Sequence, residues 1–245
     1  MKYLLTVAIN KYNGAALKGC VNDSNNMANL YRSKGYTVIQ LLDEQATKNN
    51  IVDELVKLSN ELVAGSTFIF HYSGHGSQIP SYDNTENDGL TEILCPFDLI
   101  NEDGSWTNNY ITDNELHYLF STCRAGVFIE TFFDCCHSGT ITRDLKPDVR
   151  FRHLPTEIVE PVKLETKEIR TKNSVICFSA ATDNQTAADA FINGTHQGAF
   201  TAAFLQSSGT RSERYVYILN YMKENGYTQT PQLTCEEQYL YLSLF

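Results

Sequence analysis

Short apolar runs alternate with amphipathic segments along most of the chain. The runs have the length of strands and are almost wholly apolar, as in strands buried on both faces. They cover residues 1–9, 36–42, 67–70, 127–133 and 174–180. Alternating strand and helix signals predict βαβ units and a parallel sheet. We therefore expect an α/β fold with about six strands, the last of them formed by residues 238–244.

Amphipathic spacing and capping residues predict the helices between these runs. Ile51, Leu55 and Leu58 recur at helical spacing after Thr47, which can cap the helix. Residues 112–115 fit a capping box that opens a further helix. The other predicted helices cover residues 22–34, 197–206 and 212–225.

Two segments depart from this alternation. Residues 77–110 are long, acidic and polar around the apolar run 93–95, which indicates a functional loop or a hairpin of its own. Residues 140–173 contain three prolines, and eight Lys or Arg residues lie between positions 143 and 172. This composition predicts an exposed, mobile linker within a single domain that spans residues 1–245.

Composition narrows the classes of function. The net charge of −10 argues against a nucleic-acid-binding protein, which would carry a basic face. Seven cysteines, two of them adjacent, do not resemble a disulfide framework and favour a reducing, cytoplasmic setting. Apolar runs stay well below the roughly 18 residues of a membrane span. The sequence also gives no sign of an organic cofactor. Because of the net charge and the short apolar runs, we expect neither a nucleic-acid partner nor a membrane partner.

Two motifs follow predicted strands directly. His71–Gly76 reads HYSGHG and Asp134–Gly139 reads DCCHSG. Ligand-binding and catalytic side chains of parallel sheets collect at the carboxyl ends of the strands, so His75 and Cys136 are expected to face one substrate. A cysteine beside a histidine base is an activated nucleophile. The backbone N–H groups of Gly76 and Cys136 could hold the oxyanion of acyl transfer.

Other interpretations of these residues remain open at this point. A buried cysteine often acts only as a small hydrophobic side chain, and the pairing with a histidine could be fortuitous. A zinc site at Cys135, Cys136, His137 and His75 is disfavoured, because adjacent cysteines rarely bind one tetrahedral ion. A serine nucleophile elbow is excluded by the order Gly-His-Gly at residues 74–76.

The two motifs resemble the catalytic motifs of metacaspases, the caspase-like cysteine peptidases of the C14 family. The resemblance extends over nearly the whole chain, through residues 8–23, 179–190, 198–205 and 230–235. It implies a caspase-like three-layer sandwich, with a mostly parallel central sheet and helices on both faces. Within it, residues 1–139 would correspond to a large subunit, 140–173 to a linker and 174–245 to a small subunit.

The resemblance also implies roles for particular residues. His75 would be the general base and Cys136 the nucleophile, with Cys135 a bystander. Asp23, Ser73 and Asp134 would line the pocket for the substrate residue whose carbonyl is attacked. Two carboxylates there favour Arg or Lys and repel Asp. Asp23 could instead cap a helix, and Asp134 could be a buried carboxylate bound by backbone N–H groups.

Calcium activation and self-cleavage are further implications of the resemblance. Asp113 and Asp144 match part of the calcium cluster, although Asn114 and Thr91 stand where acidic residues are usual. The Lys and Arg residues between 143 and 172 would suit the chain's own pocket, or they belong to a solvated loop. Metacaspases commonly act as monomers on protein substrates with a basic residue before the cut. The alternatives are a peptidase of different specificity or a caspase-fold protein that acts by binding.

Overall fold

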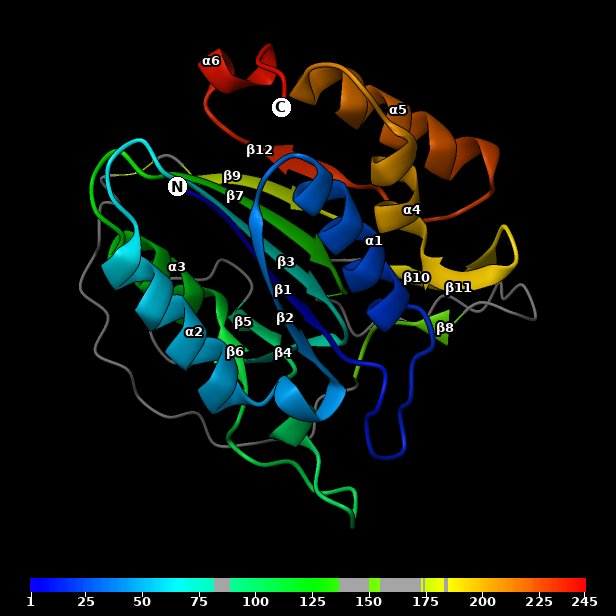
Figure 1. The fold of residues 1–245 in the computed structure, drawn as a ribbon. Helices are drawn as coiled ribbons and strands as arrows, with labels where there is room; N and C mark the ends of the chain where they lie inside the picture. Colours follow the sequence, from blue (N-terminus) through cyan, green and yellow to red (C-terminus); the bar gives the residue numbers. More distant parts are fainter. Residues whose placement is uncertain (82–88, 137–149, 155–172, 174, 183–184) are drawn as a thin grey trace.

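A six-stranded sheet forms the centre of the computed structural model, which describes all residues except 82–88, 137–149, 155–172, 174 and 183–184 (Figure 1). Its strand order is β12-β9-β7-β3-β1-β2. All neighbouring pairs are parallel except β12 and β9. The strands are β1 (Lys2–Ala8), β2 (Thr37–Leu42), β3 (Thr67–Ser73), β7 (Phe128–Asp134), β9 (Val175–Ser179) and β12 (Gln232–Thr234).

Helices cover both faces of this sheet (Figure 1). One face packs against α2 (Lys48–Glu61), α3 (Asp113–Ser121) and a small sheet of β4 (Gly76–Pro80), β5 (Leu90–Leu94) and β6 (Ile111–Thr112). The other face packs against α1 (Cys20–Ser33), α4 (Ala199–Gln206) and α5 (Arg211–Glu224). A second small sheet contains β8 (Arg150–Phe151), β10 (Ala188–Ile192) and β11 (Thr195–Gly198). The three layers that the sequence predicts are therefore present.

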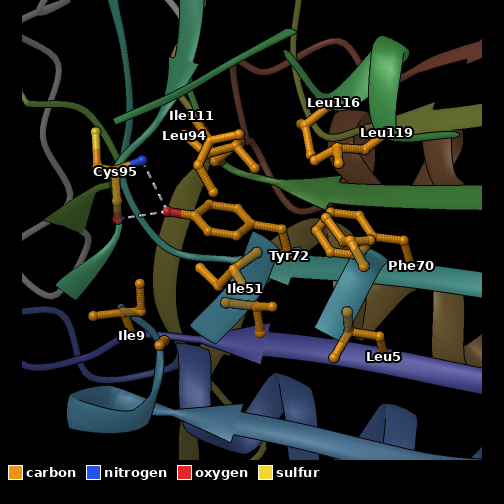
Figure 2. Close-up of a cluster of buried hydrophobic side chains, with 14 of the residues drawn as sticks. Leu5, Ile9, Ile51, Phe70, Tyr72, Leu94, Cys95, Ile111, Leu116 and Leu119 are labelled. Atoms are coloured by element: carbon orange, nitrogen blue, oxygen red, sulfur yellow. Dashed lines mark hydrogen bonds between the residues drawn. The ribbon is translucent and has the colours of Figure 1, made fainter. Parts of the chain in front are cut away.

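The apolar residues that the amphipathic spacing predicts to be buried are buried in α2. In α2, Ile51, Leu55 and Leu58 are buried, and Thr47 caps the helix by accepting a hydrogen bond from Asn50 N (3.3 Å). Figure 2 shows the core on this side of the sheet, where Ile51 lies beside side chains of β1, β3 and β5. Within it, the Tyr72 hydroxyl bonds both the N–H and the carbonyl of Cys95 (3.2 and 2.9 Å), which fixes β3 to the chain after β5. The long polar stretch after residue 77 does carry a hairpin, formed by β4 and β5.

The prediction of a last strand at residues 238–244 is wrong. A short helix, α6 (Glu237–Leu240), occupies this region, and the last strand of the sheet is β12. The backbone carbonyl of Leu242 accepts hydrogen bonds from both the N–H and the side chain of Arg211. Tyr239 packs edge-on against Phe128. This segment therefore forms hydrogen bonds with Arg211 of α5 instead of extending the sheet.

The prediction of an exposed linker is wrong for residues 150–154. Arg152 is 0% exposed and Leu154 is 4% exposed. Strand β8 pairs with β10, so these residues join a sheet instead of crossing solvent. Asn173, at the end of the predicted linker, is also buried, and its side chain accepts a hydrogen bond from Gly126 N (3.0 Å).

None of the helices in the described ranges has the length and apolar character needed to cross a membrane.

Candidate active site

The two sequence motifs lie at neighbouring strand ends of the central sheet. Strand β3 pairs directly with β7, and Ser73 lies opposite Asp134 at the carboxyl end of the pair. His75 and Cys136 follow two residues beyond these positions. Parallel pairing therefore delivers the candidate base and the candidate nucleophile to the same edge of the sheet.

His75 is held as a neutral imidazole with one nitrogen available. Its Nε2 lies 2.7 Å from the carbonyl oxygen of Ala15, which can only accept, so Nε2 carries the hydrogen. Nδ1 is buried and has no hydrogen-bond partner among the described residues. Burial lowers the pKa of His75 to about 4, although the bond to Ala15 opposes this shift. The ring also packs on Tyr12, with centroids 4.6 Å apart.

Cys136 is a buried thiol beside strand β10. Its Sγ accepts a hydrogen bond from Ala187 N at 2.7 Å. Burial raises the pKa of the Cys136 thiol to about 12, while the bond from Ala187 acts in the opposite direction. Within the described part of the chain, no hydrogen bond joins Cys136 to His75. Instead, the main chain of Arg152 contacts both residues.

The main chain of Arg152 makes the contacts that an acyl substrate would need. Its carbonyl oxygen accepts hydrogen bonds from Gly76 N (3.1 Å) and Cys136 N (3.3 Å). Its own N–H donates to the Ala187 carbonyl (3.2 Å). Two N–H groups that converge on one carbonyl oxygen form the arrangement that stabilises an oxyanion during acyl transfer.

The side chain of Arg152 fills a site lined by three carboxylates. Its guanidinium lies 2.7 Å from Asp23, 3.2 Å from Asp134 and 3.4 Å from Asp189. It also donates to the Ser73 hydroxyl at 2.7 Å. All four partners are buried. We call Asp23, Ser73, Asp134 and Asp189 the carboxylate site.

Backbone donors hold these carboxylates in place. Gly198 N donates to Asp23 (2.9 Å), and Thr201 donates to Asp134 from both its N–H and its hydroxyl (3.0 and 2.7 Å). Gly198 caps the amino-terminal end of α4 and Thr201 lies in its first turn, where unpaired N–H groups favour anions. A Cβ atom at Gly198 would collide with the Asp134 carboxylate and crowd Arg152, so only glycine leaves room for the guanidinium.

Comparison with known proteins identifies the family. The model of the caspase domain, peptidase C14, matches residues 1–241. The chain belongs to this family. It is 28% identical to Metacaspase-1 of Kluyveromyces lactis over 96% of this chain and 66% of that protein. It is 30% identical to Metacaspase-1A of Aspergillus niger over 94% of this chain and 69% of that protein. The chain thus spans about two thirds of the length of these curated relatives.

A solved structure supports the same fold. A protein of Geobacter sulfurreducens matches with a TM-score of 0.75 and 24% identity, over 99% of this chain and 97% of that one. Together, the caspase-domain match and this shared fold confirm the caspase-like architecture that the resemblance implies.

The caspase domain brings the residues named from the sequence to one place. His75, Gly76 and Cys136 contact or adjoin the Arg152 main chain, and Asp23, Ser73 and Asp134 surround its guanidinium. Asp23 is not the helix cap considered above, because α1 begins at Cys20 and Gly19 precedes it as the cap. Asp134 is indeed bound by a backbone N–H group, that of Thr201, in addition to Arg152.

Cys135 and Cys136 lie on opposite sides of the caspase-domain sheet. Cys135 packs in the core beside α2 and α3, whereas Cys136 packs in the core beside α1 and α4. Successive residues of an extended chain point to opposite faces, which separates the two sulfurs. This placement explains how adjacent cysteines can have different roles.

Sequence reasoning missed Arg152, Asp189 and Gly198. Arg152 was one of eight basic residues in the predicted linker, and nothing local distinguished it. Asp189 falls in a segment that resembles metacaspases, but its contacts with Lys18, just before α1, and with Arg152 arise only in the folded chain. Covariation across these distant positions would be the signal able to find them.

The predicted calcium ligands do not form a site among the described residues. Asp113 is the first residue of α3, and Asp144 lies outside the described ranges. The described residues contain no group of three or more His, Cys, Asp or Glu side chains arranged to hold a metal. Because Asp144 lies outside the described ranges, calcium binding by Asp113 and Asp144 stays a prediction.

Proposed function

We propose that this caspase domain is a cysteine endopeptidase that cleaves proteins after Arg or Lys. One observation carries the proposal, namely the position of Arg152. Its carbonyl oxygen accepts from Gly76 N and Cys136 N while its guanidinium pairs with Asp23 and Asp134. A substrate arginine in the same position would present its carbonyl carbon to the nucleophile and its charge to the carboxylate site.

The proposed chemistry uses the groups at the strand ends. His75 Nδ1, the nitrogen not bound to Ala15, takes the proton of the Cys136 thiol. Sγ then bonds to the substrate carbonyl carbon, and the oxygen becomes an oxyanion held by Gly76 N and Cys136 N. The peptide C–N bond breaks as His75 returns the proton to the leaving amine. Water then hydrolyses the thioester and restores the thiol.

Charge in the carboxylate site supports basic specificity. Asp23, Asp134 and Asp189 converge on one guanidinium, and charge-assisted hydrogen bonds of this kind are the stronger ones. Lysine would bring a single ammonium group, which can satisfy fewer of these oxygens at once. Aspartate would be repelled by all three carboxylates. We expect Arg to be preferred over Lys, and Asp to be rejected.

Peptide hydrolysis tests this proposal. Purified protein is assayed on fluorogenic peptides that end in Arg, Lys or Asp, beside Cys136→Ala and Cys135→Ala. We expect cleavage after Arg and Lys that is lost in Cys136→Ala, and retained in Cys135→Ala because that sulfur lies on the other face of the sheet. Cleavage after Asp would contradict the role of the carboxylate site. Binding of partner proteins without any hydrolysis would instead favour the non-enzymatic alternative.

Calcium activation and a monomeric state stay predictions. The same assay with calcium or with a chelator tests the first, and light scattering of the purified protein tests the second. A rate that is equal with calcium and with chelator would remove Asp113 and Asp144 from the proposal.

A further inference from the structure

A buried tyrosine lies in the otherwise mostly exposed loop that follows β1. Most residues between positions 11 and 18 are exposed, but Tyr12 is only 4% exposed, and its side chain contacts His75. We propose that Tyr12 is a positioning residue, which holds the imidazole of His75 in the orientation that a general base needs. This inference rests on the proposed function, because it concerns the base of the same reaction.

Tyr12 contacts both the main chain and the ring of His75. Its hydroxyl accepts a hydrogen bond from His75 N (3.1 Å) and donates to the carbonyl of Cys95 (2.8 Å). Its ring packs on the imidazole, with centroids 4.6 Å apart. Burial raises the pKa of Tyr12 well above its ordinary value, so the hydroxyl keeps the proton that it donates. The hydroxyl therefore fixes the backbone of His75, and the aromatic ring restricts rotation of the imidazole.

A turn in the same loop joins these contacts to the bond on the imidazole. Ala15 N donates to the Tyr12 carbonyl (3.3 Å), and the Ala15 carbonyl accepts from His75 Nε2 (2.7 Å). The three residues thus form a closed ring of contacts. Because both the main-chain nitrogen and Nε2 of His75 are bound, the plane of the imidazole is fixed. Its other nitrogen, Nδ1, is the one that the proposed chemistry uses.

Hydrogen bonds outside the site keep this loop in place. Asn10 N and Lys11 N both donate to the carboxylate of Asp43, which follows β2 (2.7 and 3.0 Å). On the other side of Tyr12, the side chain of Asn13 donates to the carbonyl of Ile100 (2.9 Å). The loop is therefore bound to two other segments of the chain, so Tyr12 can act as a rigid support.

A second tyrosine hydroxyl completes the support of the His75 main chain. Tyr72 shares its hydrogen between the carbonyls of His75 (2.7 Å) and Cys95 (2.9 Å), and Figure 2 shows its bonds to Cys95. A Cβ atom at Gly74 would lie 2.7 Å from the Tyr12 hydroxyl oxygen and 2.8 Å from that of Tyr72. Glycine at this position of the first motif therefore makes room for both hydroxyls.

The carboxylate site is held by other groups. Gly198 and Thr201 bind its aspartates, and within the described part of the chain no hydrogen bond joins Tyr12 to Asp23, Asp134 or Asp189. Loss of Tyr12 should therefore slow the proton transfers of His75 without weakening the binding of a substrate arginine. This expectation separates positioning of the base from a general disturbance of the site.

Steady-state kinetics on a fluorogenic Arg peptide test the proposal. Tyr12→Phe keeps the ring but removes the acceptor of His75 N, so kcat should fall about 10-fold while KM stays within about twofold of wild type. Tyr12→Leu also removes the ring, and its kcat should fall at least about 100-fold. Circular dichroism confirms that each variant is folded.

Tyr31→Phe is the matched control. Tyr31 is completely buried, and its hydroxyl has no hydrogen-bond partner among the described residues. It packs in the core on the other face of the sheet, beside α1 and α4. Removal of this hydroxyl should leave both kcat and KM as in wild type.

Nitrogen-15 NMR of the histidine side chains tests the positioning without hydrolysis. The His75 signals are identified by their loss in His75→Asn. In wild type at pH 7 the hydrogen should lie on Nε2, because the Ala15 carbonyl can only accept. In Tyr12→Leu the imidazole should populate both tautomers, whereas Tyr31→Phe should keep the hydrogen on Nε2.

The outcomes separate this inference from the proposed function. Wild type that hydrolyses no Arg or Lys peptide would overturn the proposed function, and the NMR comparison would still decide the role of Tyr12. A single Nε2 tautomer in Tyr12→Leu would overturn the positioning. An unchanged kcat in folded Tyr12→Phe, a rise in KM alone, or an equal loss in Tyr31→Phe would also overturn it and leave the peptidase standing.

Discussion

At the scale of residues, a few buried polar contacts define the chemistry of the caspase domain. The hydrogen bond that His75 Nε2 donates to the Ala15 carbonyl leaves Nδ1 as the basic nitrogen, and the Ala187 N–H donates to the Cys136 sulfur. Asp189 adds a carboxylate to the pair that the sequence had indicated, and its second oxygen accepts from Lys18 N (2.8 Å). Each of these contacts suggests a substitution with a defined effect.

Replacement of Asp189 by Asn should reduce the preference for Arg over Lys. The substitution removes one charged acceptor from the guanidinium, which is worth about 1.5–3 kcal/mol for a hydrogen bond to a charged group. We expect kcat/KM on an Arg peptide to fall by at least about 10-fold and that on a Lys peptide to fall less, because an ammonium contacts fewer carboxylates. Asp103→Asn, at an exposed position, is the control. An equal loss on both peptides would contradict a role in selecting the guanidinium.

Buried histidines should make the stability of the protein fall in mild acid. Burial lowers the pKa of His71 to about 3 and that of His75 to about 4, from an ordinary value of 6.5. Between about pH 6.5 and 4 the unfolded chain binds these protons and the folded chain does not, so the free energy of unfolding decreases as pH falls. Above pH 6.5 this contribution is constant.

Urea unfolding at pH 7 and pH 5 measures this effect. His71→Asn should recover about 2 kcal/mol of the stability difference between the two pH values, since it removes one of the protons taken up on unfolding. His117→Asn replaces an exposed histidine and should leave the difference as in wild type. An unchanged pH dependence in His71→Asn would mean that the folded protein protonates His71 normally.

At the scale of elements, helix termini and strand ends position the site. Strands β3 and β7 deliver the catalytic candidates. The amino-terminal end of α4 binds the carboxylate of Asp23 through its cap residue Gly198 and that of Asp134 through Thr201. Helix α5 is joined to β7 by a buried ion pair in which Arg211 donates twice to Glu130 (2.9 and 3.0 Å). This pair couples the carboxyl-terminal part of the chain to the strand that precedes Cys136.

Removal of Arg211 should therefore destabilise the protein strongly. Arg211→Met leaves Glu130 as an unpaired buried carboxylate, which costs about 3–5 kcal/mol. The double variant Glu130→Gln/Arg211→Met should lose less than the sum of the two single variants, because it leaves no unpaired charge. Chemical denaturation of the four proteins gives this coupling energy. Lys57→Met, which breaks the exposed pair with Glu54, should change stability by less than about 1 kcal/mol.

At the scale of the whole molecule, the predicted linker joins two parts of the chain that share one fold. Strands β7 and β9 pair along residues 129–133 and 175–179, one on each side of the predicted linker. Their core is shared, since Phe132 of β7 packs on Phe178 of β9 (centroids 5.2 Å apart) and on Phe204 of α4 (4.6 Å).

If the chain is cut between residues 143 and 172, the two fragments should consequently remain together. The cut protein should elute with uncut Cys136→Ala in gel filtration and have the same mass by light scattering, because the central sheet spans both fragments. In urea the fragments should separate. Dissociation of the fragments in native buffer would show that the β7–β9 pairing depends on the intact connection.

The sequence by itself determined the layered α/β fold and half of the candidate site. Strands that are apolar throughout must be buried on both faces, and motifs that directly follow them must lie at one sheet edge, so His75, Cys136 and their backbone donors could be placed from local pattern alone. The resemblance to metacaspases then indicated Asp23, Ser73 and Asp134.

Only the tertiary structure decided what occupies that site. Arg152 looked like one basic residue among several in a proline-containing linker, and Asp189 was one residue of a segment that resembles metacaspases, with no role assigned to it. Both derive their roles from contacts with distant segments, 129 residues apart for Arg152 and Asp23. Local periodicity cannot report such contacts, and the same limitation explains the wrong strand at residues 238–244, where packing against α5 outweighed the apolar pattern.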